Sequence, residues 1–406
     1  MINAGDTAFV LISAALVLLM TPGLAFFYGG LVRKQNVLTI MMQIFIAMGV
    51  VATIWVLGGF SLAFGQDWHG IIGDFSYFAL QGVGLAPNPA HGPTIPFLVF
   101  FAFQLMFAII TPALVTGAFA DRVKFSGYLW FLVLWSILVY IPVAHWLWGG
   151  GFLAQMGAQD FAGGMVVHAT AGFGALASVL VVGKRYMPQG KSPSLPHNLP
   201  FVALGTGLLW FGWFGFNAGS ALAANGVAAT AFVNTQIAAS VAMVAWLVVQ
   251  WLVDGKPTVS GPLIGAVAGL ATITPAAGFV QPWAAAVIGL AAGLVPFGAM
   301  RLRMTWKNVD DALGVWGCHG VGGALGSILL GVFAVSSVNG VRGAIQGDLH
   351  QLLVQIIAVV IVAVYAFVLT WGILKVLDAV GTLRVPREVE AEGLDEALHG
   401  EVAYAD

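Results

Sequence analysis

Two histidines stand inside long apolar stretches of this sequence, and each follows an aspartate by eight residues. Asp160 leads to His168 in DFAGGMVVH, and Asp311 leads to His319 in DALGVWGCH. An ionisable side chain at membrane depth is energetically costly, so such residues mark candidate functional sites. Two facing imidazoles can share a proton, offer hydrogen bonds to a small polar solute and relay a proton. The alternative is that each histidine only hydrogen-bonds neighbouring helices.

The composition identifies the environment of these histidines. Of the 406 residues, 60% are hydrophobic and only 8% are charged. A soluble domain has about 25% charged residues, so the chain is expected to be an all-α integral membrane protein. Apolar stretches of about 20 residues suit eleven transmembrane helices. We expect them at 7–32, 38–64, 96–120, 126–148, 162–183, 199–219, 228–253, 261–279, 283–301, 312–334 and 350–379.

The basic residues predict the orientation of these spans. With the N-terminus outside and the C-terminus inside, fourteen of the fifteen Lys and Arg residues fall on the inner side and only Arg342 falls outside. Five spans are an odd number of crossings, so spans 6–10 would enter the membrane inverted relative to spans 1–5. The sequence therefore predicts an inverted repeat plus an extra helix 11, in a multi-pass protein of the cell membrane.

The end of the chain differs from the rest. We divide the sequence into a transmembrane domain, residues 1–380, and a C-terminal tail on the cytoplasmic side, residues 381–406. All five glutamates of the chain lie in this tail. Its composition alone favours a solvated, partly disordered segment, and the alternative is a docking element.

Aromatic residues near the outer ends of the spans indicate a second type of site. Trp148 precedes three glycines, and Ser220 ends the segment GWFGFNAGS. A tryptophan face beside a hydroxyl forms a cation–π site with a hydrogen-bond acceptor. Phenylalanines just below it would form a constriction that repels hydrated ions. We expect Asp160 to be mainly a helix N-cap with some attraction for cations, and Asp310 and Asp311 to cap span ten from inside.

The sequence contains none of the motifs that would indicate nucleotide, metal or nucleic-acid binding. The sequence contains no Walker loop, no dinucleotide-binding glycine fingerprint and no histidine–carboxylate cluster with metal spacing. A basic surface for nucleic acid is also absent, and the single Cys318 excludes an internal disulfide. We therefore expect neither an enzyme nor a cofactor, metal or nucleic-acid site.

Several segments resemble the ammonium transporter family (Amt/Mep/Rh), and in particular its bacterial Amt branch. They are AFFYGGLVRKQN, FAFQLMFAIITPALVTGAFADR, AHWLWGGG, DFAGGMVVH, GKR, PHNLP, GWFGFNAGSA, ITPAAG, HGVGG and the tail GTLRVPREVEAEGLDEALHGEVAY. The resemblance extends over essentially the whole chain. It implies a homotrimer with one pore in each subunit, and a tail that contributes to contact with a PII-type signalling protein at the cytoplasmic face.

The resemblance also implies a role for each candidate residue. It implies an outer recruitment site of Trp148, Ser220 and Phe107 supported by Asp160, a gate of Phe107 and Phe216, and a pore with His168 and His319. The implied function is to recruit ammonium, remove its proton and conduct ammonia into the cytoplasm, with or without separate proton transfer.

Two residues depart from the family pattern. Ile264 stands where relatives often have a small or hydroxyl residue, so we expect a less polar wall at span eight. Gly314 stands where relatives often have an aspartate, so the inner end of span ten and its regulation are expected to differ.

The sequence leaves three functions open besides ammonium transport. One is an ammonium sensor that signals through its tail, although no kinase or cyclase domain is present. The others are a water or urea channel, and an intramembrane hydrolase.

Overall fold

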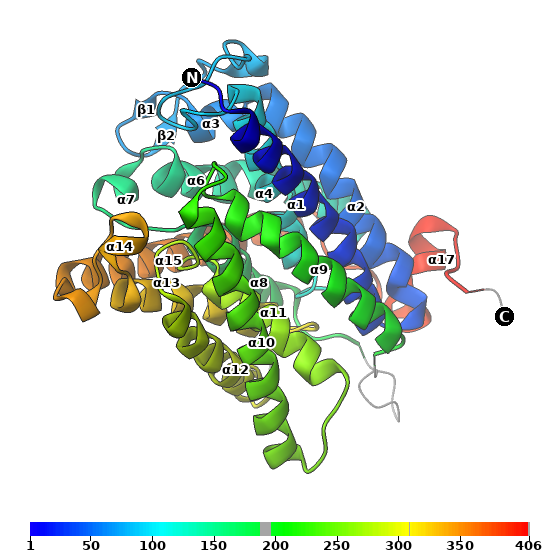
Figure 1. Ribbon diagram of the computed structural model, residues 1–406. Helices are drawn as coiled ribbons and strands as arrows, with labels where there is room; N and C mark the ends of the chain where they lie inside the picture. Colours follow the sequence, from blue (N-terminus) through cyan, green and yellow to red (C-terminus); the bar gives the residue numbers. More distant parts are fainter. Residues whose placement is uncertain (187–195, 308, 405–406) are drawn as a thin grey trace.

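The computed structural model describes residues 1–186, 196–307 and 309–404, and this part of the chain is a bundle of long helices (Figure 1). Helices α1 and α9, which begin the two predicted halves, pack along each other. The short hairpin of β1 and β2, with α7 and α14, lies at one end of the bundle, and α17 lies at the other. The names outer and cytoplasmic are used below for these two ends, following the orientation that the basic residues predict.

The helices and strands have the following bounds. The first half contains α1 (Ala4–Leu31), η1 (Lys34–Asn36), α2 (Val37–Ile54), η2 (Trp55–Gly59), α3 (Phe60–Phe64), β1 (Asp67–Trp68), β2 (Ile72–Gly73), η3 (Phe78–Leu80), α4 (Phe97–Val115), α5 (Phe125–Trp135), η4 (Ser136–Tyr140), α6 (Ile141–Trp148), α7 (Phe152–Gln155), η5 (Gly164–Ala169) and α8 (Thr170–Val182). The second half and tail contain α9 (Leu199–Gly219), α10 (Gly226–Asp254), α11 (Ser260–Ile273), α12 (Pro282–Met304), η6 (Trp316–Val321), α13 (Gly322–Phe333), α14 (Ser336–Asn339), η7 (Ala344–Gln346), α15 (Leu349–Ala379), α16 (Arg387–Glu392) and α17 (Leu394–His399).

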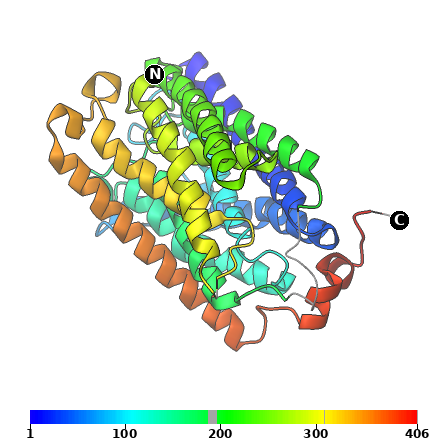
Figure 2. The ribbon, with the colours of Figure 1, turned by 90° about the horizontal axis from the view of Figure 1, so that it is seen from below.

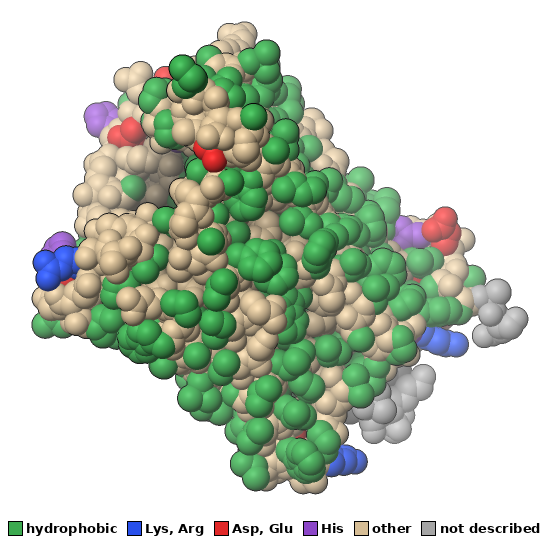
Figure 3. All heavy atoms as spheres, in the orientation of Figure 1, with side chains coloured by type: hydrophobic (Ala, Val, Ile, Leu, Met, Phe, Trp, Pro, Cys, Tyr) green, Lys and Arg blue, Asp and Glu red, His purple; other side chains and the backbone are tan. Residues whose placement is uncertain are grey.

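The expected membrane fold is confirmed in its main features. Within the described residues, ten helices are long and apolar enough to cross a membrane, and α11 is a shorter apolar helix. Apolar side chains cover much of the visible face, whereas the visible charged side chains lie toward its margins (Figure 3). Such a surface suits contact with lipid. The count of eleven spans and their orientation stay predictions.

Both histidines lie in wide helical turns at corresponding places. His168 is in η5, which continues into α8, and His319 is in η6, which continues into α13; both turns are π-helical. Such turns are rare and occur frequently at functional sites. The two segments approach closely because glycine faces glycine. A Cβ atom at Gly172 would collide with the backbone of Gly320, so only glycine allows this crossing.

The described part of the tail packs on the cytoplasmic loops, so the expectation of a solvated segment is wrong for it. Asp395 accepts hydrogen bonds from the backbone N–H groups of Leu38 and Thr39, at 3.0 and 2.8 Å, and thereby caps α2. Glu390 is fully buried, and its carboxylate accepts a 2.8 Å hydrogen bond from Arg384. Two acidic residues of the tail are therefore held in buried contacts, Asp395 with α2 and Glu390 with Arg384 of the tail and the backbone N–H of Tyr186, which composition alone does not reveal.

One of the two predicted caps of span ten is confirmed and the other is wrong. Asp311 accepts hydrogen bonds from the N–H groups of Val315 and Trp316, at 3.0 and 2.9 Å. Asp310 instead pairs with Arg185, whose Nε and Nη2 atoms lie 2.9 and 3.0 Å from its two carboxylate oxygens. Burial raises the pKa of Asp310, but Arg185 outweighs that effect and lowers the pKa to about 2. Asp310 thus joins a loop to the bundle as a charged partner.

Candidate functional site

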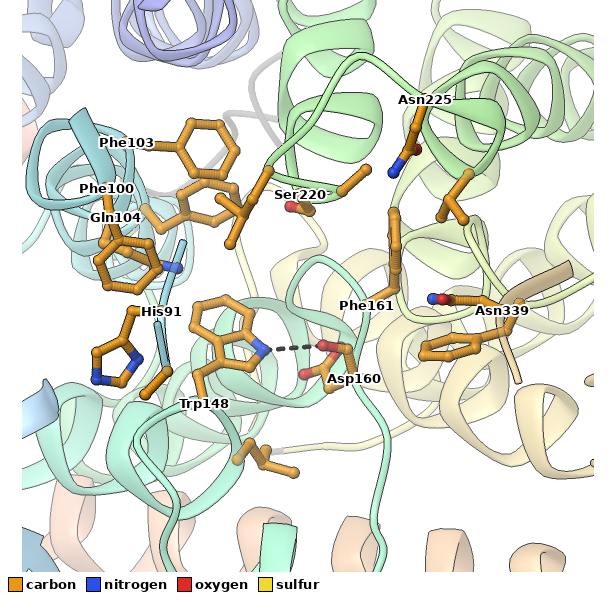
Figure 4. Close-up of a pocket in the computed structure, with 17 residues that line it drawn as sticks. His91, Phe100, Phe103, Gln104, Trp148, Asp160, Phe161, Ser220, Asn225 and Asn339 are labelled. Atoms are coloured by element: carbon orange, nitrogen blue, oxygen red, sulfur yellow. Dashed lines mark hydrogen bonds between the residues drawn. The ribbon is translucent and has the colours of Figure 1, made fainter. Parts of the chain in front are cut away.

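A cavity of about 350 Å³ opens at the outer end of the bundle. Its lining combines aromatic rings with polar side chains from separate helices (Figure 4). Among them are Gln104, Phe107, Trp148, Asp160, Ser220 and Asn225. We call this space the outer cavity. All four residues of the predicted recruitment site lie on its wall.

Trp148 is fixed at the end of α6 by a hydrogen bond across the cavity wall. Its indole Nε1 donates to the backbone carbonyl of Asp160 at 2.8 Å (Figure 4). The indole ring is half-buried, and its centroid lies 5.7 Å from that of Phe107 in an edge-to-face arrangement. The indole N–H donates to the Asp160 carbonyl and is therefore not free to bind a ligand. A cation in the cavity would contact the π face of the ring instead.

Asp160 is a cap, as the sequence predicted. Its carboxylate accepts hydrogen bonds from four consecutive backbone N–H groups, those of Gly163, Gly164, Met165 and Val166, at 2.6–3.0 Å. The side chain is only 7% exposed. It therefore shapes the start of the histidine-bearing segment, and its negative charge acts on the cavity only at a distance.

Ser220 presents an acceptor to the outer cavity. Its hydroxyl donates to the carbonyl of Phe216 at 2.8 Å, one helical turn earlier. The hydroxyl hydrogen is thereby occupied, and the oxygen lone pairs remain for an N–H donor. Ser220 and Trp148 therefore line one space with complementary means of holding a cation that carries N–H groups.

Two phenylalanine rings close the floor of the outer cavity. The centroids of Phe107 and Phe216 lie 4.3 Å apart, and each side chain is 1% exposed. Phe107 lines the outer cavity, and Phe216 lines the next cavity inward. The two rings, tilted by 41° to each other, thus lie between the two spaces.

The two histidines meet directly below these rings. The Nδ1 atoms of His168 and His319 lie 3.2 Å apart, and the ring centroids are 5.2 Å apart. One nitrogen must donate and the other accept. A histidinium ring has a donor on both nitrogens, so this contact requires at least one neutral ring. The side chains are 1% and 4% exposed, which places the pair in a water-poor part of the bundle.

The cavity around the histidines is narrow and otherwise apolar. Its volume is about 10 Å³, close to the smallest space that holds one water-sized molecule. Besides the two imidazoles its wall is mainly aliphatic and aromatic, including Leu114, Val167, Trp213 and Phe216. We call it the histidine cavity. A bare ion would lose its hydration shell there, and few polar groups of the protein would replace the lost contacts with water.

Trp213 was missed by sequence reasoning. Its ring lies 5.4 Å from that of His168, and its Nε1 donates to Thr274 Oγ1 at 2.9 Å. The signal was present, because Trp213 and Phe216 recur at helical spacing on α9 and Ser220 continues this spacing at the C-cap of the helix. His91 and Asn339 also line the outer cavity, and no motif pointed to them.

The two departures have local structural counterparts. Ile264 is half-buried on α11 and is absent from the wall of the histidine cavity, to which α11 contributes Val267. The expected effect of Ile264 on the pore wall therefore stays a prediction. Gly314 has φ +73°, and a Cβ atom there would collide with Met300. A side chain at this position would be strained, so glycine suits the observed turn.

Together these features define a class of protein. Within the described residues, no group of three or more His, Cys, Asp or Glu side chains is arranged to hold a metal ion. The bundle contains an outer cavity lined by aromatic and polar side chains, a buried pair of phenylalanine rings and a narrow cavity with two imidazoles. This is the architecture of a membrane channel or transporter for a small solute.

Comparisons with known proteins identify the family. A family model described as the Ammonium Transporter Family matches residues 8–404. The ammonium transporter of Bacillus subtilis (strain 168) is 47% identical over 405 residues, covering 99% of both chains. The crystal structure of Candida albicans Mep2 has a TM-score of 0.90 at 35% identity, covering 99% of this chain and 91% of that one. A structure titled "Sensor Amt Protein" has a TM-score of 0.90 at 31% identity, covering 97% and 98%.

The chain belongs to the ammonium transporter family. It is a multi-pass cell-membrane protein and not an enzyme.

Proposed function

We propose that this protein takes up ammonium at its outer side and conducts it across the cell membrane as neutral ammonia. The observation that carries the proposal is the direct contact of His168 and His319 in an apolar cavity below a closed aromatic gate. A charged ion is strongly disfavoured in such a space, whereas a small neutral solute with hydrogen-bonding groups is accepted.

The first step is recruitment in the outer cavity. Ammonium would rest against the π face of Trp148 and donate a hydrogen bond to Ser220. The edge of Phe107 contributes to the same wall, and the buried carboxylate of Asp160 adds long-range attraction. These groups suit a cation with N–H bonds better than one without them.

The second step is transfer of one proton from ammonium to external water at the outer cavity, before the gate, so that the N–H bond breaks there and the proton stays outside. Potassium and ammonium ions have similar size and charge, so size alone separates them poorly. Only ammonium can give up a proton and continue as a neutral molecule. Opening of the Phe107–Phe216 pair would admit ammonia to the histidine cavity, where it can exchange hydrogen bonds with the imidazoles. The shared Nδ1 contact also offers a route for a separate proton transfer.

The assembly and its regulation form part of the proposal. We propose a homotrimer with one pore in each subunit, and binding of a PII-type signalling protein at the cytoplasmic face. The support is the family membership together with the packing of the tail. The described tail contacts the loop after α1 at Arg33 and the loop before α5 at Lys124, so a protein bound to it could act on those loops.

Removal of either imidazole tests the proposal. Purified protein would be reconstituted in liposomes that contain a pH-sensitive dye, and ammonium or potassium would be added outside. We expect His168→Ala and His319→Ala to lose ammonium-driven internal alkalinisation or to admit potassium. His350→Ala, which removes an exposed histidine, serves as the control. Full flux with unchanged selectivity in both pore variants would contradict the proposal.

A sensor is the second candidate. The structure titled "Sensor Amt Protein" has the same fold over nearly the whole chain, so fold alone does not separate sensing from transport. The liposome experiment separates them, because a sensor without substantial flux would give internal alkalinisation no faster than that of protein-free liposomes.

A further inference from the structure

Two glutamines stand one turn apart near the outer end of α15. Gln351 is 9% exposed and Gln355 is fully buried. This helix crosses the membrane along the flank of the bundle, and α8 packs beside it (Figure 2). A buried amide in such a helix needs hydrogen-bond partners to offset its desolvation. The proposed transport steps do not use either glutamine.

The Gln355 carboxamide forms a reciprocal pair with the backbone of Gln159. Its Oε1 accepts from the Gln159 N–H at 2.7 Å, and its Nε2 donates to the Gln159 carbonyl at 2.8 Å. The second hydrogen on Nε2 reaches the carbonyl of Ser327 at 3.1 Å, and Gln351 donates to Oε1 at 3.3 Å. Every donor and acceptor direction of the amide is therefore engaged.

The segment held by this pair leads directly into the outer cavity. Residues 158–160 have no regular secondary structure, so internal helix bonds do not fix their position. Gln159 precedes Asp160, whose carbonyl accepts the indole N–H of Trp148 and whose carboxylate caps the next segment. A shift of the Gln159 peptide would thus move both the acceptor of Trp148 and the cap.

We propose that Gln355 is a positioning residue for the cation-recruitment site, and this proposal rests on the proposed function. The reciprocal pair fixes the Gln159–Asp160 peptides, which in turn fix the indole of Trp148 in the wall of the outer cavity. Gln351 supports the arrangement by donating to the Gly157 carbonyl at 3.1 Å. Gln355 acts through these groups without touching the substrate.

The proposal predicts a specific kinetic signature. Gln355→Met keeps the length of the side chain and removes both bonds to Gln159. Recruitment should weaken while the gate and the histidine pair stay in place, so the apparent KM for ammonium should rise about tenfold, equivalent to about 1.4 kcal/mol. The maximal rate should stay within about twofold. Gln355→Glu keeps an acceptor for the Gln159 N–H and should lie between Gln355→Met and the wild type.

A matched control lies on the same helix. Thr370 is fully buried, and its hydroxyl accepts the Trp135 indole N–H at 2.9 Å. It stands fifteen residues further along α15, about 22 Å away. Thr370→Val removes a buried hydrogen bond of α15 at the other end of the bundle, so its apparent KM should equal that of the wild type.

The experiment measures initial ammonium flux against concentration in proteoliposomes of each variant. A raised KM in Gln355→Met with an unchanged KM in Thr370→Val supports the positioning role. An unchanged KM in Gln355→Met, or an equal rise in both, overturns it. If Gln355→Met does not yield a monodisperse protein, the same comparison is made with Gln355→Glu. Absence of saturable flux in the wild type would instead overturn the proposed function, and this inference with it.

Discussion

Replacement of Asp160 tests how the outer site is held together. Four N–H groups donate to its two carboxylate oxygens at 2.6–3.0 Å, two to each oxygen. Asparagine keeps one accepting oxygen and turns an NH₂ group toward two of these N–H groups. At roughly 1.5 kcal/mol for each bond to a charged acceptor, Asp160→Asn loses about 3 kcal/mol of stability and Asp160→Ala about 6 kcal/mol.

The second half of the protein provides an internal comparison. The carboxylate of Asp311 accepts from two N–H groups, at 3.0 and 2.9 Å. Asp311→Ala should therefore cost about as much as Asp160→Asn, roughly 3 kcal/mol. Thermal unfolding of the purified protein in detergent, followed by the fraction that remains monodisperse, gives the order of stability. We expect wild type to be most stable, Asp160→Asn and Asp311→Ala intermediate, and Asp160→Ala least stable.

Two outcomes would refute this reasoning. If Asp160→Asn unfolds at the temperature of the wild type, the four bonds do not support the segment. If Asp160→Ala unfolds together with Asp311→Ala, the number of N–H groups accepted does not determine the cost. Flux measured at a temperature where every variant is folded then reports the combined effect of the lost charge and the lost cap on transport.

Two further predictions concern the crossing of the helices and the cytoplasmic charges. Gly172→Ala places a methyl group in the backbone of Gly320 and should force the two imidazoles apart, with loss of flux. Gly320→Ala, whose methyl group would lie 3.1 Å from Gly172, should be milder, and equal flux in both variants would contradict the packing argument. Asp310 has a pKa lowered to about 2, so its stabilising contribution is complete above its unfolded-state pKa of about 4 and is lost as the pH falls toward 2. The difference in unfolding temperature between wild type and Asp310→Asn should therefore be present at neutral pH and shrink in this acidic range; a constant difference would count against the ion pair.

Much of the fold was predictable because lipid imposes strict rules on sequence. Long apolar stretches must be helices, and their approximate positions could be read from hydropathy. The predicted spans 96–120 and 261–279 nevertheless extend past the ends of α4 at Val115 and α11 at Ile273. The paired aspartate–histidine spacing predicted two equivalent segments, and each of these segments contains a π-helical turn. The turns themselves could not be predicted, because local sequence does not specify an extra residue in a helical turn.

Part of the site was predictable for a different reason. His168, Trp148 and Ser220 are polar or amphipathic groups in apolar surroundings, so each was conspicuous. Their mutual arrangement depends on contacts between residues far apart in the chain. The contact between Gln159 and Gln355 joins residues 196 positions apart, and no periodic pattern in the sequence predicts it.

The errors at the cytoplasmic face have the same origin. Asp310 was predicted to be a helix cap because it precedes span ten. Its carboxylate instead pairs with Arg185, which is 125 residues away in the sequence. The tail was predicted to be solvated because it is acidic. The carboxylate of Asp395 instead accepts hydrogen bonds from backbone N–H groups at the start of α2. In both cases the partner that decides the outcome is remote in sequence.

The central claim is that a dry passage selects for a solute that can give up a proton. The most direct measurement is the response of wild-type proteoliposomes to equal pulses of ammonium and potassium, recorded by internal pH and by potassium content. The account predicts internal alkalinisation with ammonium that is faster than in empty liposomes, and potassium entry no greater than in empty liposomes. Comparable entry of both ions would contradict it.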